Sequence, residues 1–284
     1  MTAQVVRRAA VAGSWYPGEA QALADEVDRY LEAVEGLPRG EVVALVAPHA
    51  GLVYSGPVAA YAYRLVADRR FDVAVLVGPS HRVGFSGVAI DPTGSWETPL
   101  GPAAIDGDVA ARILAHGAMV RESRSIHAHE HSLEMQLPFL RRVLPGVPIV
   151  PLVMGYQTRS TVEGLALALA AALEGKRALI VASSDLSHYH PAGAAAELDS
   201  RVTGLVELFD ADGLMALIER FPEHACGGGP IVAAMKTARE LGARDGKVLK
   251  YADSGDVSGD KSAVVGYLAA AFGSFGSGPA SPAS

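Results

Sequence analysis

Three histidines in this chain occupy places where an imidazole could bind a metal or move a proton. His49 follows the apolar run EVVALVAP, His81 follows FDVAVLVGPS, and His188 stands three residues after Asp185 in SSDLSHY. One such histidine would be explained by backbone hydrogen bonding at the end of a strand. Three histidines in equivalent places favour a functional site.

The chain has a single cysteine, Cys226, in the segment HACGGGPIVAAM. Three glycines allow close approach of the backbone. A helix beginning after them would direct its N–H groups at the loop, lowering the pKa of the thiol and favouring the metal-binding thiolate. An inert buried cysteine is the alternative, but a glycine-rich loop beside His224 makes a poor apolar core.

Two histidines and one anionic ligand are the donor set of many non-haem iron sites. A thiolate in place of the usual carboxylate makes the site softer, so iron, copper and zinc are all compatible with it. His188 would then be a free base near the metal. Asp185 could orient His188 or a neighbouring group, as carboxylates orient catalytic imidazoles.

The elements that would position these residues alternate between apolar strands and amphipathic helices. This order predicts an α/β fold with a mostly parallel central sheet flanked by helices. Ligands of open α/β sheets bind at the carboxyl ends of the strands, so His49, His81, Asp185 and His188 are expected to converge there. The strands are predicted at 41–48, 71–79, 147–155, 177–184, 246–256 and 262–272, and the helices at 19–35, 55–68, 160–175 and 230–242. The second helix would have Pro57 near its start, and the third would begin with a Ser160–Glu163 capping box.

Composition limits the class of protein. The chain has 284 residues, half of them hydrophobic, which suits a single α/β domain over 1–272, followed by a disordered tail at 273–284. A net charge of −7 argues against nucleic-acid binding, and the arginine pairs, such as Arg7–Arg8, are expected on solvated faces.

The longest apolar run, 165–173, is too short to span a membrane. No signal peptide is recognisable and one cysteine allows no intrachain disulfide, so we expect a cytoplasmic protein.

Several long motifs, in order, resemble the MEMO family, known in prokaryotes as AmmeMemoRadiSam system protein B. They are AGSWYP, APHAGLVYSGPVAAYAY, LVGPSH, EHSLEMQLPFL, SSDLSHY and DSGDVSGDKSAVVGY, and the resemblance covers about residues 6–272. It implies a fold similar to the LigB-type class III extradiol dioxygenases. It also implies AMMECR1-like and radical SAM proteins as partners.

The resemblance further implies roles for individual residues. The metal of MEMO-like proteins would lie between His49, His81 and Cys226, with His188 at the position of the dioxygenase general base. Trp15 resembles the tryptophan that lines the cleft. Extradiol dioxygenases have glutamate where this chain has Cys226, a departure that argues against ring cleavage. The family is linked to redox activity with copper or iron, and its eukaryotic member to phosphotyrosine-peptide binding.

The run IHAHEHSLEMQLPFL contains three further histidines. His131 and Glu134 could share a helix face through i, i+3 spacing, but no H-E-x-x-H zinc motif is present. We interpret Glu130, His131 and Glu134 as residues that bond and orient the metal ligands. The other two, His127 and His129, are expected in an exposed loop.

Three functions remain open. The first is a metal-dependent redox or dioxygenase-like enzyme acting on a small aromatic or other organic molecule. The second is a hydrolase, either with zinc at the same ligands or with Cys226 and His188 or His224 as a metal-free nucleophile pair. The third is a non-catalytic module that binds a peptide or other ligand in a former active site.

Overall fold

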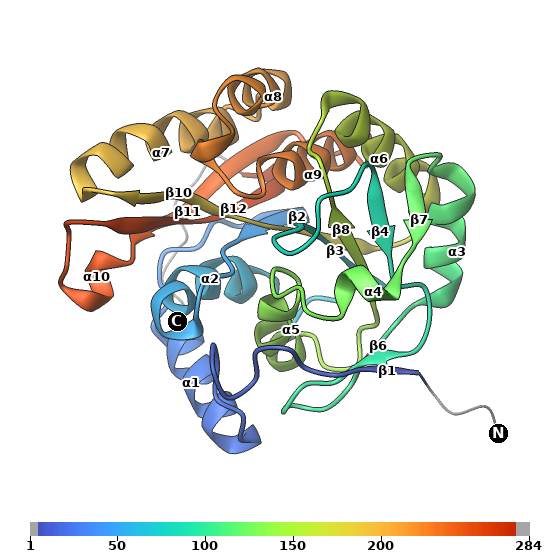
Figure 1. The fold of residues 1–284 in the computed structure, drawn as a ribbon, viewed down its shortest axis with the longest axis horizontal. Coiled ribbons are helices and arrows are strands. Elements are labelled where there is room, and N and C mark those ends of the chain that lie inside the picture. Colours follow the sequence, from blue (N-terminus) through green and yellow to red (C-terminus); the bar gives the residue numbers. More distant parts are fainter. Residues whose placement is uncertain (1–4, 277–284) are drawn as a thin grey trace.

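The computed structural model describes residues 5–276, and its central feature is a mixed sheet of nine strands (Figure 1). Four parallel strands form the middle in the order β2-β9-β3-β8. They are β2 (Gly40–Ala47), β9 (Ala178–Ser183), β3 (Val73–Pro79) and β8 (Ile149–Met154). All four coincide with predicted strands, and the α/β fold class is confirmed.

Antiparallel strands extend this parallel centre on both sides. Beyond β2 lies β12 (Val264–Phe275), which pairs in turn with β10 (Asp185–His190) and β11 (Asp245–Asp253). Beyond β8 lie β4 (Val88–Ile90), antiparallel to it, and the edge strand β7 (Val120–Glu122). The sequence did not indicate β10, whose pairing with β12 is interrupted by register shifts on both sides of His188.

Helices cover both faces of the sheet and create two apolar cores (Figure 1). This is why every residue of β3 is buried, and why its sequence is continuously apolar rather than alternating. One face carries α3 (Gly107–His116), α6 (Arg159–Ala172), α7 (Ala192–Glu207), α8 (Ala211–Arg220) and α9 (Gly228–Glu240). The other carries α1 (Ala20–Glu32), α2 (Leu52–Val66) and α5 (Leu137–Val143). Of these, α3, α5, α7 and α8 were not predicted.

Smaller elements complete the fold. A separate three-stranded sheet consists of β1 (Val6–Arg7), β5 (Ser95–Trp96) and β6 (Ala103–Ala104). The short helices are α4 (Arg124–His127), α10 (Gly255–Ser258) and the 3₁₀ turns η1 (Glu134–Gln136) and η2 (Pro222–His224). No helix within residues 5–276 combines the length and apolar character needed to cross a bilayer.

Two predicted helix starts were wrong. Helix α2 begins at Leu52, whose side chain is buried and whose N–H donates to Trp15 O (2.8 Å), so Pro57 lies inside the helix. Helix α6 is capped by Thr158, which accepts from Thr161 N, instead of by a Ser160–Glu163 box. In both cases a contact just before the predicted start extends the helix backwards.

The end of the described chain also differs from the prediction. Gly273, Ser274 and Phe275 were assigned to a disordered tail, yet they continue β12 and pair with Val42, Glu41 and Gly40 of β2. The strand continues because these residues complete the hydrogen bonding along the edge of β2. The remainder of the predicted tail, 277–284, lies outside the described residues.

Replacing Gly273 should therefore destabilise the protein. A Cβ atom at this position would lie 1.9 Å from Glu41 O, a backbone atom of β2 that cannot move aside. We expect Gly273→Ala to lower the free energy of unfolding by about 2–3 kcal/mol in a denaturant titration. Gly276→Ala, whose added Cβ would meet nothing within 4 Å, is the control. Equal stability of the two variants would contradict the pairing of β12 beyond residue 272.

Candidate metal centre

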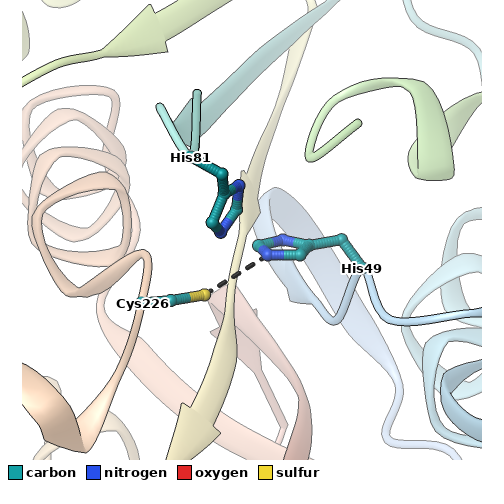
Figure 2. A group of neighbouring side chains, drawn as sticks. All are labelled: His49, His81 and Cys226. Atoms are coloured by element: carbon teal, nitrogen blue, oxygen red, sulfur yellow. Dashed lines mark hydrogen bonds between the residues drawn. The ribbon is translucent and has the colours of Figure 1, made fainter. Parts of the chain in front are cut away.

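Three side chains from distant segments converge at the carboxyl edge of the parallel strands (Figure 2). His49 follows β2, His81 follows β3, and Cys226 lies just before α9. Their ligand atoms all lie within 4.8 Å of one another, and Cys226 Sγ is 3.3 Å from His49 Nε2. A nitrogen and a sulfur bound to one tetrahedral metal would be about 3.6 Å apart, so this donor set fits a metal ion.

Hydrogen bonds leave the correct nitrogen of His49 free. The Ser183 hydroxyl donates its one proton to Ser132 O (2.7 Å) and accepts from Gln136 Nε2 (2.8 Å). Its oxygen can therefore only accept from His49 Nδ1, 2.8 Å away. The proton of the ring is thus on Nδ1, and the lone pair of Nε2 faces Cys226.

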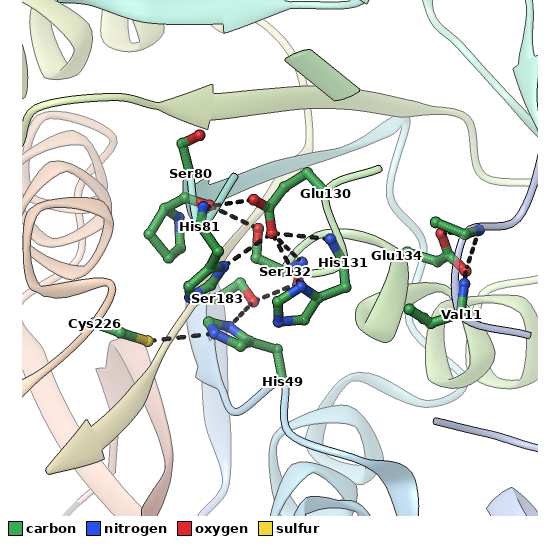
Figure 3. Close-up of polar contacts among 12 residues, drawn as sticks. Val11, His49, Ser80, His81, Glu130, His131, Ser132, Glu134, Ser183 and Cys226 are labelled. Carbon is green, nitrogen blue, oxygen red and sulfur yellow. Dashed lines mark hydrogen bonds and ion pairs between the residues drawn. The ribbon is translucent and has the colours of Figure 1, made fainter. Parts of the chain in front are cut away.

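The carboxylate of Glu130 fixes the tautomer of His81, as Ser183 does for His49 (Figure 3). This carboxylate accepts from His81 Nδ1 (2.9 Å) and from the His81 backbone N–H (2.6 Å). It also accepts from the N–H groups of His131 and Ser132, each at 2.9 Å. Burial alone would raise the pKa of Glu130, but these hydrogen bonds hold it well below its usual value. The ionised carboxylate thus orients His81 with Nε2 directed away from it.

Burial keeps the imidazoles neutral. It lowers the pKa of His49 well below the usual value, with further lowering by His81 and His131. Burial, followed by the effect of His81, lowers the pKa of His131 to about 4. A neutral imidazole has the free lone pair that a metal requires, so at neutral pH the His49 ring is ready to bind a cation.

The prediction of a lowered thiol pKa was wrong. Burial raises the pKa of the Cys226 thiol, and the nearby Asp185 carboxyl raises it further. The N-terminus of α9 is close, since its N-cap is Gly227, but burial is the largest influence on the pKa of the thiol. The thiolate in this loop therefore needs a bound cation to stabilise it.

Asp185 connects the metal-binding segments. Its Oδ1 accepts from the backbone N–H of His49 (2.7 Å) and of Ala50 (3.3 Å). Its own N–H points at Cys226 Sγ (3.3 Å), and its carbonyl accepts from Cys226 N (3.2 Å). Asp185 thus positions the segments that carry His49 and Cys226 instead of orienting His188.

His188 lies outside the three-ligand cluster but near it. It contributes electrostatically to the lowered pKa of His49. Its Nδ1 donates to Leu186 O at 2.8 Å, which leaves Nε2 as the basic nitrogen. This is the tautomer that a general base beside the metal centre would need.

Aromatic rings cover the centre from the side of the N-terminal segment. The half-buried Trp15 ring lies 4.3 Å from the ring of His131, which stacks on His81 at 4.6 Å. The edge of His131 also faces His49 at 5.7 Å. His131 therefore supports the ligands by packing, and no hydrogen bond joins it to either of them within residues 5–276.

The structure gives Glu134 a role other than the predicted one. Its carboxylate accepts from Arg7, from the backbone of Ala10 and Val11, and from Tyr16 Oη. Figure 3 shows it turned away from the histidines and toward Val11. Glu134 therefore anchors the segment that carries Trp15, because the unpaired N–H groups of that segment need a buried acceptor.

Arg7, expected on a solvated face, is buried and donates to three partners. They are the Glu134 carboxylate, His127 O (2.9 Å) and Glu130 O (2.7 Å). Its guanidinium also lies 4.2 Å from the centre of the Trp96 ring. Sequence alone gave no signal of this, since the arginine becomes buried only when β1 pairs with β5.

The two remaining histidines of the run have different environments. His129 is exposed, as predicted, whereas the prediction for His127 was wrong. His127 is fully buried, its Nε2 lies 3.2 Å from Ala89 O, and its ring meets Trp96 edge-on. Its burial follows from the packing of α4 against β4, which the sequence did not indicate.

Over most of its length, the chain is similar to proteins of one known family. A profile described as "Memo-like protein" matches residues 7–271. A MEMO1 family protein of Methanosarcina mazei is 41% identical over 267 residues, 93% of this chain and 98% of the relative. One from Ignicoccus hospitalis is 37% identical over 281 residues, 94% of this chain and 99% of the relative.

A solved structure shares the fold. The crystal structure of the uncharacterized protein JW3007 from Escherichia coli K12 matches with a TM-score of 0.57 at 16% identity. The match covers 80% of this chain and 99% of that one. At this identity the likeness concerns the fold alone.

The Arg7–Glu134 pair should be essential for stability. Removing one partner of a buried pair leaves the other charge without compensation, so Glu134→Ala should lower the free energy of unfolding by about 3–5 kcal/mol. The matched control is Glu97→Ala, which removes an exposed pair with Arg8 and should cost less than about 1 kcal/mol. Denaturant titrations of both variants measure the difference. Similar losses would contradict the anchoring role of Glu134.

Proposed function

The chain belongs to the Memo-like family, and from this premise we propose that it is a metal-dependent redox protein. Its centre would bind iron or copper through His49, His81 and Cys226. The observation that carries the proposal is the convergence of three ligand atoms within 4.8 Å, with the Nδ1 proton of each histidine engaged elsewhere. Such an arrangement supports metal binding because both Nε2 lone pairs are left free.

The donor set favours a transition metal of intermediate softness. Imidazole suits zinc, copper and iron, and thiolate shifts the preference toward softer ions. A bound iron or copper ion would supply an electron-transfer centre and a Lewis acid for a substrate oxygen. With three protein ligands, further coordination positions would remain for a small molecule.

The residues around the centre support chemistry on a bound substrate. His188 has its basic Nε2 free and could take a proton from a substrate hydroxyl. The half-buried Trp15 offers a ring against which a small aromatic or other organic molecule could pack. Asp185 would hold the His49 and Cys226 segments in place while this occurs.

A non-catalytic binding function is the second candidate. Tyr54 and Tyr189 are 41% and 76% exposed, and they lie on segments that carry His49 and His188. Exposed tyrosines on these segments are suited to peptide or ligand binding, since each offers a flat apolar face and a polar hydroxyl. This candidate predicts ligand binding that persists in the Cys226→Ser variant.

Metal content tests the proposal directly. Protein purified anaerobically should contain nearly stoichiometric iron or copper by mass spectrometry of the elements. His49→Ala, His81→Ala and Cys226→Ser should each lose it, while the exposed His129→Ala should retain it. Zinc in their place would favour hydrolysis. Folded wild-type protein without metal would overturn the redox proposal and leave the binding candidate.

Glu130 should determine how tightly the metal binds. Gln in its place has only one oxygen for the four N–H groups that now donate to the carboxylate. We expect Glu130→Gln to weaken metal affinity about 10- to 100-fold in a competition with a chelator. The exposed Glu122→Gln serves as the control. Unchanged affinity in Glu130→Gln would argue against His81 as a ligand.

A further inference from the structure

One side-chain amide, that of Gln157, bonds twice to the loop that carries Cys226. Gln157 Nε2 donates to Cys226 O at 2.7 Å, and Gln157 Oε1 accepts from Gly229 N at 2.6 Å. A carbonyl oxygen can only accept and a backbone N–H can only donate, so these two neighbours determine which end of the amide is the nitrogen. Both ends of the amide are thereby used within one short stretch of chain.

The bond to Gly229 supplies a cap for α9. The first N–H groups of a helix have no partner within the helix. The N-cap residue of α9 is Gly227, which has no side chain that could accept from them. Gln157 Oε1 accepts from one of these groups instead. A Cβ at Gly229 would lie 2.9 Å from both Cβ and Oε1 of Gln157, so the third glycine of HACGGG leaves room for the amide.

The bond to Cys226 completes the support of the loop. The N–H of Cys226 donates to Asp185 O at 3.2 Å, and Gly227 N donates to Ser184 Oγ at 2.9 Å. These two contacts hold the loop to the residues that join β9 to β10. Gln157 holds the carbonyl of Cys226 to the segment that follows β8. The cysteine is therefore attached through both of its neighbouring peptide groups, to the ends of two different strands.

The backbone on both sides of Gln157 is itself held. The residue lies between the end of β8 at Met154 and Thr158, the N-cap of α6. The N–H of Tyr156 donates to Phe85 O at 2.8 Å, and the Thr158 side chain accepts from α6. A side chain on a backbone that is fixed on both sides can position the group it bonds to. Gln157 is half-buried and meets this condition.

We propose that Gln157 is a positioning residue that holds Cys226 with its sulfur toward His49. Sγ lies 3.3 Å from His49 Nε2, and three glycines follow the cysteine. Glycines have the greatest backbone freedom, so this loop needs side-chain contacts to keep the sulfur in one place. The positioning is a property of the protein without metal, whereas its effect on metal affinity rests on the proposed function.

Alkylation of Cys226 in chelator-treated protein tests the positioning, because this is the only cysteine in the chain. Gln157→Met keeps a side chain of similar length and removes both hydrogen bonds. We expect iodoacetamide to react about tenfold faster with this variant, since the loop opens more often when its hydrogen bonds are lost. Gln21→Met is the matched control, at an exposed glutamine that bonds to Asp25 on α1, and should react at the wild-type rate.

Gln157→Glu separates the positioning of Cys226 from the capping of α9. A carboxylate still accepts from Gly229 N, and its negative charge is favourable at a helix N-terminus. The denaturant midpoint of this variant should therefore equal that of wild type. The carboxylate has no N–H to donate to Cys226 O and repels this carbonyl oxygen. A role in capping alone would leave Gln157→Glu equal to wild type in metal binding as well.

Cobalt(II) is the probe for metal binding, because a thiolate ligand gives it a charge-transfer absorption that imidazole does not. We expect Gln157→Glu and Gln157→Met to bind cobalt about tenfold more weakly in a competition with a chelator. Their thiolate absorption at saturation should also be weaker than that of wild type. The charge of the glutamate would by itself attract a cation, so weaker binding in Gln157→Glu has to come from the position of the sulfur.

Two results would overturn the inference. One is an unchanged alkylation rate in folded Gln157→Met. The other is wild-type cobalt affinity and absorption in Gln157→Glu, which would reduce the role of the amide to capping α9. Wild-type protein that binds no cobalt would count against the proposed metal function, and the alkylation rates would still decide whether Gln157 positions Cys226. If Gln157→Met does not fold, Gln157→Glu provides the test.

Discussion

The parallel alignment of β2, β9 and β3 is the constraint on which the rest of the site depends. Ala47 pairs with Ser183 and Val77 pairs with Ala182, so the three strands end at one edge of the sheet. Residues separated by more than a hundred positions in the chain are thereby brought to the same place. Ser183 is the last residue of β9, and His49 and His81 follow β2 and β3 within two residues. His49 therefore meets Ser183 at this edge without a long connecting loop.

Strand alignment alone would leave the imidazoles free to rotate, and buried acceptors remove that freedom. Ser183 fixes the tautomer of His49, and Glu130 fixes that of His81. Each acceptor is itself held: Ser183 by Ser132 and Gln136, and Glu130 by three backbone N–H groups. A group with all its hydrogen bonds made is costly to move, so the ligand positions are determined by a network that extends through Gln136 to Tyr63 in the core beside α2.

Local sequence predicted the four central strands and the meeting of His49, His81 and Asp185, because these follow from apolar runs and the rule for strand ends. It could not predict the environment that tertiary contacts create. Arg7 is buried through pairing of β1 with β5, and His127 through packing of α4 on β4. The raised thiol pKa of Cys226 likewise depends on desolvation by segments distant in sequence. Helix dipoles can be inferred from a motif, whereas burial cannot.

The raised thiol pKa has a consequence for how this centre would acquire its ion. Without metal, burial keeps His49 and Cys226 in their uncharged forms, and the carboxyl group of Asp185 is also pushed toward protonation by burial. A cation would reverse this balance, because its charge stabilises the thiolate that desolvation disfavours. Metal binding and loss of the thiol proton would then be one event, favoured by rising pH. Burial makes the Cys226 thiolate costly when no metal is bound. The same burial would exclude water from a bound ion and so strengthen the attraction between the ion and the sulfur.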